Sequence, residues 1–155
     1  MPTLASPDFG QLEFLEEDIL NFAGGVPAFE ELRRFLLVEK QELEPFVFLV
    51  SVDSPTTRFI CIPVCLLDPD YQFELSPDEG AQAGLKDGHY SAVSPDGPLV
   101  LAITTLSKSA PATVNLASPV VINAALRLGT QLILSGTAYS HVTPLRLCST
   151  VEEAC

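Results

Sequence analysis

Short apolar segments rich in Val, Ile and Phe recur along the chain, and Pro, Gly, Asp or Ser separate them. This rhythm is typical of antiparallel strands joined by turns. The pattern predicts ten strands, at residues 11–15, 19–22, 35–39, 46–52, 58–62, 71–75, 89–93, 98–106, 120–123 and 131–134.

Two short helices are predicted between these strands. One covers residues 28–34. The other begins at Ser76, where Ser-Pro-Asp-Glu supplies an N-cap, a proline at the first helical position and a capping-box Glu79. Gly80 and Gly84 should keep this second helix short, because glycine is a poor helix former.

The order of elements predicts a mainly β fold. Short strands without a long helical crossover cannot form a parallel sheet. We therefore expect an antiparallel meander, closed or half-closed into a β-barrel or sandwich, with one or two short helices, because closure hides strand edges. No repeat or long linker divides the 155 residues. A single domain over residues 1–155 is expected, with loose termini at 1–8 and 146–155.

The charge balance restricts the partners that the chain can bind. Twenty acidic and eight basic residues give a formal net charge of -12. Such a surface repels phosphate, so direct binding of nucleic acid or of an anionic membrane is not expected, and a basic protein partner is favoured. Residues 97–151 contain no Asp or Glu. This segment is either mostly buried strand or a neutral face opposite an acidic one.

Motifs for localisation and catalysis are missing from the sequence. The first residues have neither a basic leader nor an apolar core, and no apolar run reaches the length of a membrane span, so a cytoplasmic protein is expected. His89 and His141 have no His or Cys at zinc-ligand spacing, and no phosphate loop or nucleophile elbow is present. We expect no catalytic residue, no metal and no cofactor. Cys61 and Cys65 are interpreted as small core residues.

Carboxylates are numerous along the chain, and several of them are close neighbours. Neighbouring pairs such as Glu16-Glu17, Glu30-Glu31 and Asp68 with Asp70 could supply an acid and a base for a glycosidase. A sugar cleft is usually lined by aromatic residues, yet the chain has no Trp and three Tyr. Solvated acidic loops are the better interpretation, and they favour a binding function.

The segment from Gly24 to Glu31 is the first candidate binding element. Gly25, with the glycine before it, can supply a positive φ, and Pro27 stiffens the exit of the loop. Phe29, followed by Glu30 and Glu31, is either an aromatic anchor for a partner or the residue that fixes the predicted short helix to the core.

The segment from Pro69 to Leu75 is the second candidate. Alternation places Tyr71 and Phe73 on one face of a strand, and Asp70 and Glu74 on the other. If the aromatic residues face the core, an acidic ladder faces outward, with Asp68 in the preceding turn.

Asn115 and Asn123 are embedded in apolar sequence, where an amide must find hydrogen-bond partners. We expect each to satisfy backbone groups of a loop and so to shape a site, in preference to contacting a partner directly. Gly129 is predicted as the positive-φ position of the connection that follows Asn123.

Five segments in a fixed order make the sequence resemble a known family. They are Asn21–Leu32, Pro45–Val52, Pro69–Leu75, Thr113–Asn123 and Gly129–Leu134. Together they are similar to the bacterial flagellar assembly factor FliW family, over a region from about Phe9 to Leu145.

The resemblance implies a non-enzymatic protein that binds two partners in turn. One is flagellin, and the other is CsrA, an RNA-binding translational regulator that represses flagellin synthesis. When flagellin is exported, the released factor would bind the regulator and relieve repression. A small-molecule-binding β-barrel without catalytic activity is the alternative, although the Phe residues are numerous enough to fill its cavity. An enzyme with convergent titratable groups in a pocket is the third class.

Overall fold

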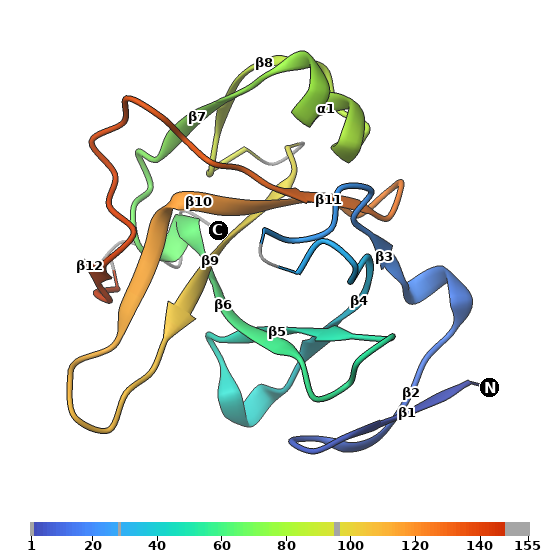
Figure 1. Ribbon diagram of the computed structural model, residues 1–155. Helices are drawn as coiled ribbons and strands as arrows, with labels where there is room; N and C mark the ends of the chain where they lie inside the picture. Colours follow the sequence, from blue (N-terminus) through green and yellow to red (C-terminus); the bar gives the residue numbers. More distant parts are fainter. Residues whose placement is uncertain (1, 28, 95–96, 148–155) are drawn as a thin grey trace.

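The computed structural model describes residues 2–27, 29–94 and 97–147 (Figure 1). One α-helix, α1 (Pro77–Ala83), and three short 3-10 helices accompany the strands in this part of the chain. The 3-10 helices are η1 (Glu16–Asp18), η2 (Gln41–Leu43) and η3 (Val64–Leu66). The strands are β1 (Thr3–Ser6), β2 (Gly10–Glu13), β3 (Leu20–Asn21), β4 (Arg34–Glu39), β5 (Val47–Ser51), β6 (Arg58–Pro63), β7 (Gln72–Leu75), β8 (Gly88–Ser91), β9 (Leu99–Thr105), β10 (Thr113–Asn123), β11 (Leu128–Gln131) and β12 (Thr143–Pro144).

Seven strands close into a barrel, which confirms the predicted mainly β, barrel-type fold. Their order is β11-β3-β4-β5-β6-β9-β10, and β10 pairs back to β11. Figure 1 shows this ring with the β1–β2 and β7–β8 hairpins outside it. One pairing departs from the antiparallel prediction, because β11 and β3 are parallel, with Leu128 opposite Asn21. A ring with an odd number of alternating strands must contain one pair that runs in the same direction.

Strand β10 is longer than its prediction, which covered only residues 120–123. It pairs with β9 at both ends, and its register shifts between Asn115 and Val120. Pro119 and Asn115 resemble turn residues in the sequence, but in the structure they lie at this irregularity. Residues 132 and 134 continue beside it, since their N–H groups donate to the carbonyls of Pro119 and Ala117. The strand predicted at residues 131–134 therefore corresponds to β11, which begins and ends three residues earlier, at Leu128–Gln131.

Three apolar clusters hold the barrel and its hairpins together. The barrel interior contains side chains from several strands, while a second cluster joins the outer face of β9 and β10 to β7, and a third joins the outer face of β4 and β5 to β1 and β2. Alternate residues of one strand therefore enter different clusters. Phe35, Leu49 and Ile122 point inward, whereas Leu36, Val50 and Val121 point outward. Burial on both faces explains the continuous apolar runs.

The prediction of a loose N-terminus at residues 1–8 is wrong. Residues 3–6 form β1, which pairs with β2, and Leu4 is buried in the third cluster. The hairpin is also attached to the barrel by the ring contact of Phe9 with Phe48 and by the ion pair between Asp8 and Arg58. At the other terminus, Arg146 and Leu147 are exposed, and residues 148–155 lie outside the described residues.

The two helix predictions have opposite outcomes. The helix at Ser76 is confirmed: the Ser76 Oγ accepts from the N–H of Glu79 at 3.2 Å, and the Glu79 carboxylate accepts from the N–H of Ser76 at 2.9 Å. The helix predicted at residues 28–34 is absent from the described part of this segment. Consecutive turns replace it. The backbone N–H of Phe29 donates to the carbonyl of Val26, and the N–H of Leu32 donates to the carbonyl of Phe29. Val26 and Leu32 are both buried in the barrel interior, and turns allow both to point there.

Cys61 is a small core residue on β6, as predicted. Its side chain is fully buried in the barrel interior, and burial raises the pKa of the thiol to about 12. Cys65 lies half-buried in η3. In the described ranges, no helix is long and apolar enough to cross a membrane.

Candidate protein-binding surfaces

The β3–β4 loop, residues 22–33, places Phe22, Val26 and Leu32 in the barrel interior and carries the first candidate surface. The N–H of Phe22 donates to the carbonyl of Arg33 at 2.8 Å, which closes the loop at its base. Gly25 has φ 68°, and a Cβ added there would lie 2.4 Å from the carbonyl oxygen of Glu30. Only glycine fits at this close approach of two backbone segments.

Phe29 contacts the barrel and is also partly exposed. Its ring packs edge-on against Phe59 of β6, with ring centroids 5.6 Å apart, and Phe59 in turn contacts Phe35 in the core. The side chain is nevertheless 37% exposed, and the neighbouring Glu30 and Glu31 are exposed as well. The ring is therefore held against the barrel and is also partly exposed to solvent.

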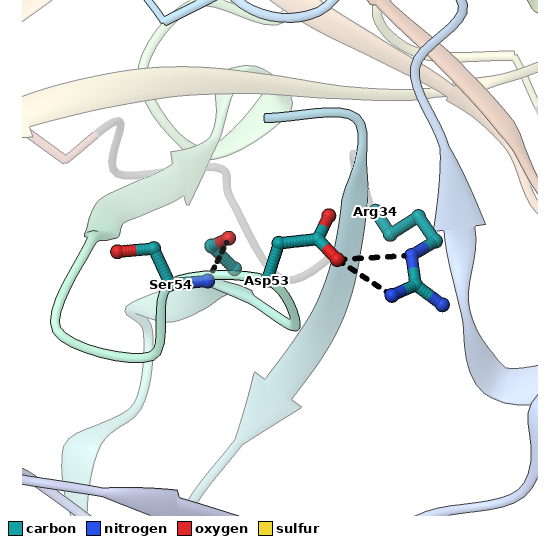
Figure 2. A network of polar contacts seen from close by, with 4 residues as sticks. Arg34, Asp53 and Ser54 are labelled. Carbon is teal, nitrogen blue, oxygen red and sulfur yellow. Dashed lines mark hydrogen bonds and ion pairs between the residues drawn. The ribbon is translucent and has the colours of Figure 1, made fainter. Parts of the chain in front are cut away.

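An ion pair fixes the exit of this loop (Figure 2). Arg34, the first residue of β4, donates from Nε and Nη2 to Asp53 Oδ1 at 3.2 and 2.5 Å. Asp53 lies in the turn after β5, where the N–H of Ser54 donates to the Oγ of Ser51 at 2.9 Å. The hydrogen bond to Asp53 raises the pKa of Arg34 above its ordinary value. Both side chains are partly exposed, so the pair contributes little to the stability of the fold.

Strand β7 carries the second candidate surface, and its alternation agrees with the sequence pattern. Tyr71 and Phe73 are buried, whereas Asp70 and Glu74 are exposed. Asp68 is half-buried in the preceding turn, and its Oδ1 accepts from the N–H of Asp70 at 2.9 Å. We call Asp68, Asp70 and Glu74 the acidic strand surface.

Tyr71 holds this surface against the barrel. Its hydroxyl donates to the carbonyl of Leu116 on β10 at 2.5 Å, and its ring lies 4.3 Å from that of Tyr139, centroid to centroid. Burial raises the pKa of the Tyr71 phenol, and the neighbouring Tyr139 and Asp68 add to this shift. The phenol therefore stays protonated and remains a hydrogen-bond donor.

The two candidate asparagines bond to backbone groups. Asn115 Oδ1 accepts from the N–H groups of Ala117 and Ser118 at 3.2 and 3.1 Å, at the irregularity in β10. Asn123 accepts from the N–H of Leu126 and donates to the carbonyl of Gly84 at the end of α1, both at 3.3 Å. Each side chain thus shapes a connection next to β7 or α1.

The predicted role of Gly129 is wrong. The positive φ in this connection belongs to Arg127, at 57°. Gly129 instead lies under the ring of Phe22, where an added Cβ would come within 2.5 Å of the ring. Glycine is required there for close packing.

The structure gives two surfaces, not one. Phe29 packs on β6 through Phe59, whereas β7 packs on β10 through Tyr71. The sequence pattern does not predict the groove of about 480 Å³ beside Glu74, which Glu79 and Ile133 also line. Ile133 is 65% exposed, although it lies in an apolar run that predicts a buried strand. No group of three or more His, Cys, Asp or Glu side chains in the described residues is placed to hold a metal ion.

The fold defines a class of protein, a closed β-barrel with two external hairpins and carboxylates along one of them. The family model of the FliW protein matches residues 3–145. The chain therefore belongs to the FliW family.

Individual relatives agree with this assignment. The flagellar assembly factor FliW of Carboxydothermus hydrogenoformans is 36% identical over 152 residues, which cover 97% of this chain and 94% of that protein. The flagellar assembly factor FliW of Natranaerobius thermophilus is 33% identical, with 92% and 91% covered. A crystal structure of the flagellar assembly factor FliW superposes with a TM-score of 0.80 at 30% identity, covering 92% of this chain and 96% of that one.

Proposed function

We propose that this flagellar assembly factor binds flagellin and the translational regulator CsrA in turn, in the cytoplasm and as a single domain. Free flagellin occupies the factor. Export of flagellin releases it, and the free factor then binds the regulator and relieves repression of flagellin synthesis. The chain acts in this scheme by binding, without catalysis, cofactor or contact with RNA.

The acidic strand surface supports the regulator part of the proposal. Asp70 and Glu74 are exposed on a chain with a net charge of -12, and Tyr71 and Phe73 hold their strand against the barrel. An RNA-binding protein carries a cationic surface because it must neutralise phosphates. An acidic partner is attracted to such a surface and, once docked, raises the electrostatic cost of RNA approach.

The β3–β4 loop supports a second contact. Phe29 presents an aromatic ring beside exposed Glu30 and Glu31, and aromatic residues are frequent anchors of protein interfaces. Pro27 and Gly25 shape the loop around it.

The ligand-binding barrel is disfavoured by the packing of the interior. Buried side chains from all sides of the ring meet there, among them Phe22, Phe35, Leu49 and Leu101. A barrel of this size holds a ligand only where side chains leave space for one.

Competition between purified partners tests the proposed function. Immobilised regulator should retain this chain, and added flagellin should release it in proportion to its concentration. Retention of the chain by neither partner at micromolar concentrations would contradict the proposal.

Reversing the acidic strand surface should slow association with the regulator. For the triple variant Asp68→Lys, Asp70→Lys and Glu74→Lys, we expect an association rate about tenfold lower at low salt, because electrostatic steering is lost. The salt dependence should also flatten. Stopped-flow kinetics at several ionic strengths measure both quantities, and circular dichroism checks the fold.

A matched control reverses three exposed carboxylates elsewhere, with Glu17→Lys, Glu42→Lys and Glu44→Lys. It makes the same change in net charge and should slow association much less. If both triple variants associate at the same rate, only net charge matters and the acidic strand surface has no specific role. Flagellin binding should be unchanged in the Asp68, Asp70 and Glu74 variant.

Truncating the anchor should weaken binding with a limited loss of stability. For Phe29→Ala we expect about a tenfold weaker complex with at least one of the two partners, since an anchor costs about 1–2 kcal/mol or more when removed. The free energy of unfolding should fall by less than the roughly 3–5 kcal/mol of a buried Phe. Calorimetric titration and urea unfolding measure the two effects. A core-sized loss of stability with unchanged binding would assign Phe29 to the core alone.

A further inference from the structure

One edge of β4 is left without a strand partner along most of its length. β3 has two residues and pairs only with the start of β4, Leu20 with Phe35 and Asn21 with Arg34. β5 pairs with β4 on the other side as far as Glu39. Before Leu20 the chain turns through η1, and no strand in the described part of the chain continues beside residues 36–39.

The backbone of this edge is oriented toward the missing strand. In an antiparallel ladder, alternate residues turn their N–H and C=O groups to the same neighbour. The backbone carbonyl of Arg34 accepts from the N–H of Val52, which follows the end of β5. The backbone groups of Leu36 and Val38, two and four positions later, therefore also bond toward β5. Leu37 and Glu39 therefore direct their N–H and C=O groups to the unpaired side.

A groove of about 350 Å³ lies along the same four residues. Strand β2 and the segment that follows it contribute part of the lining, and the barrel strands β3, β4, β9 and β10 contribute most of the rest. The apolar lining combines side chains of the barrel interior, Leu20, Leu37, Leu99 and Ile122, with side chains of the third cluster, Leu12, Phe14, Leu36 and Val38. We call this space the β4-edge groove.

The polar lining of the groove is acidic. Glu13, Asp18 and Glu39 contribute carboxylates, and no basic side chain belongs to the lining that the described residues form. Asp18 is partly engaged, because its Oδ2 accepts from the N–H of Leu15 at 2.8 Å. Glu13 and Glu39 are exposed. The groove therefore suits a segment that combines apolar side chains with cationic ones.

We propose that the β4-edge groove binds an extended segment of a partner protein as an added β-strand. The segment contains about three apolar residues flanked by Lys or Arg, because the edge from Leu36 to Glu39 spans roughly 10 Å at 3.3 Å per residue. Main-chain hydrogen bonds to Leu37 and Glu39 supply affinity, and the apolar lining selects the side chains. The site is separate from the β3–β4 loop and from the acidic strand surface, so it goes beyond the proposed function.

A second copy of this chain is a poorer occupant than such a segment. A two-fold pairing of β4 edges would place the same surface on both sides of the contact. The carboxylates of Glu13, Asp18 and Glu39 would then lie on both sides of one interface, and like charges across an interface are unfavourable.

Backbone amide signals of the labelled protein test strand addition directly. The probe is the peptide acetyl-Lys-Val-Leu-Val-Lys-amide, with acetyl-Glu-Val-Leu-Val-Glu-amide as the charge-reversed control. We expect the basic peptide to shift the amides of Leu37 and Glu39 and to slow their hydrogen exchange. Two further peptides carry N-methyl groups at alternate residues, one at the odd positions and one at the even positions. Only the peptide whose methylated N–H groups face β4 should bind about tenfold more weakly, because about 1.4 kcal/mol of hydrogen bonding is lost.

Charge variants separate groove binding from general attraction. The pair Glu13→Lys with Glu39→Lys should weaken binding of the basic peptide about tenfold. The matched pair Glu42→Lys with Glu44→Lys, on exposed residues outside the groove, should weaken it much less. Unchanged amides at residues 36–39 under saturating peptide, or equal effects of the two pairs, would overturn the proposal. Concentration-dependent dimers in light scattering, with the same amides shifted, would assign the edge to a second copy instead.

Discussion

Replacing Tyr71 by alanine is expected to lower the free energy of unfolding by about 4 kcal/mol or more. Truncation of a buried aromatic side chain costs roughly 3–5 kcal/mol. Tyr71 is fully buried, and its hydroxyl donates to the Leu116 carbonyl at 2.5 Å. The variant also leaves that carbonyl without its partner, which adds about 1–3 kcal/mol. Urea unfolding followed by far-ultraviolet circular dichroism measures the loss.

Two milder variants divide this effect into its parts. Tyr71→Phe keeps the ring and should cost about 1–3 kcal/mol, the penalty for an unsatisfied buried carbonyl. Tyr90→Phe is the matched control, because its hydroxyl donates to the Lys86 carbonyl at 2.7 Å in an exposed setting. There water can replace the lost donor, so the loss should stay below about 0.5 kcal/mol. Equal losses in the two Phe variants would show that burial of the Tyr71 hydroxyl is not what makes it important.

Gly25→Ala is expected to cost about 2–5 kcal/mol and to disturb the loop that carries Phe29. A non-glycine residue at positive φ costs roughly 1–2 kcal/mol, and overpacking adds about 1–3 kcal/mol. Both apply at Gly25, where φ is 68° and the added Cβ would lie 2.4 Å from the Glu30 carbonyl oxygen and 2.5 Å from its Cα. Backbone atoms cannot swing away as a long side chain can. Thermal unfolding gives the stability, and ring signals of Phe29 and Phe59 report their contact.

Gly10→Ala is the control, because Gly10 has the same φ of 68° and a Cβ there would meet nothing within 4 Å. The free energy of unfolding of that variant should fall only by the conformational cost of a positive φ, about 1–2 kcal/mol. The difference between the two glycine variants isolates the contact with Glu30. If they lose the same stability and the Phe29–Phe59 contact persists, the loop tolerates the methyl group and Gly25 does not determine its shape.

Local signals in the sequence were sufficient where a few adjacent residues decide the structure. The α1 cap from Ser76 to Glu79 forms as its spacing predicts, since both hydrogen bonds join residues three positions apart. The alternation over Tyr71, Phe73 and Glu74 also determines which side chains are buried. A short strand against an apolar surface has one favourable orientation, because a shift by one residue would expose both aromatic rings.

Local signals failed where distant residues compete for the same space. Residues 29–34 can form a helix by composition, but Val26 and Leu32 both reach the barrel interior only through turns. The sequence pattern predicts Gly129 as a turn residue, yet glycine is required there by the Phe22 ring, more than a hundred positions earlier in the chain. Contacts between residues so far apart in the chain cannot be predicted from local sequence spacing.

The amino-acid sequence by itself determined the strand rhythm, the acidic charge, the alternation on β7 and the family. These properties depend on residue types and on spacings of a few positions. Only the tertiary structure decided that seven strands close with one parallel pair, that Phe29 rests on Phe59, and that β3 begins too late to cover residues 36–39 of β4. Closure, ring contact and an uncovered edge arise from segments far apart in the chain. Their geometry is fixed when the barrel packs, because each buried side chain must share one interior with the others.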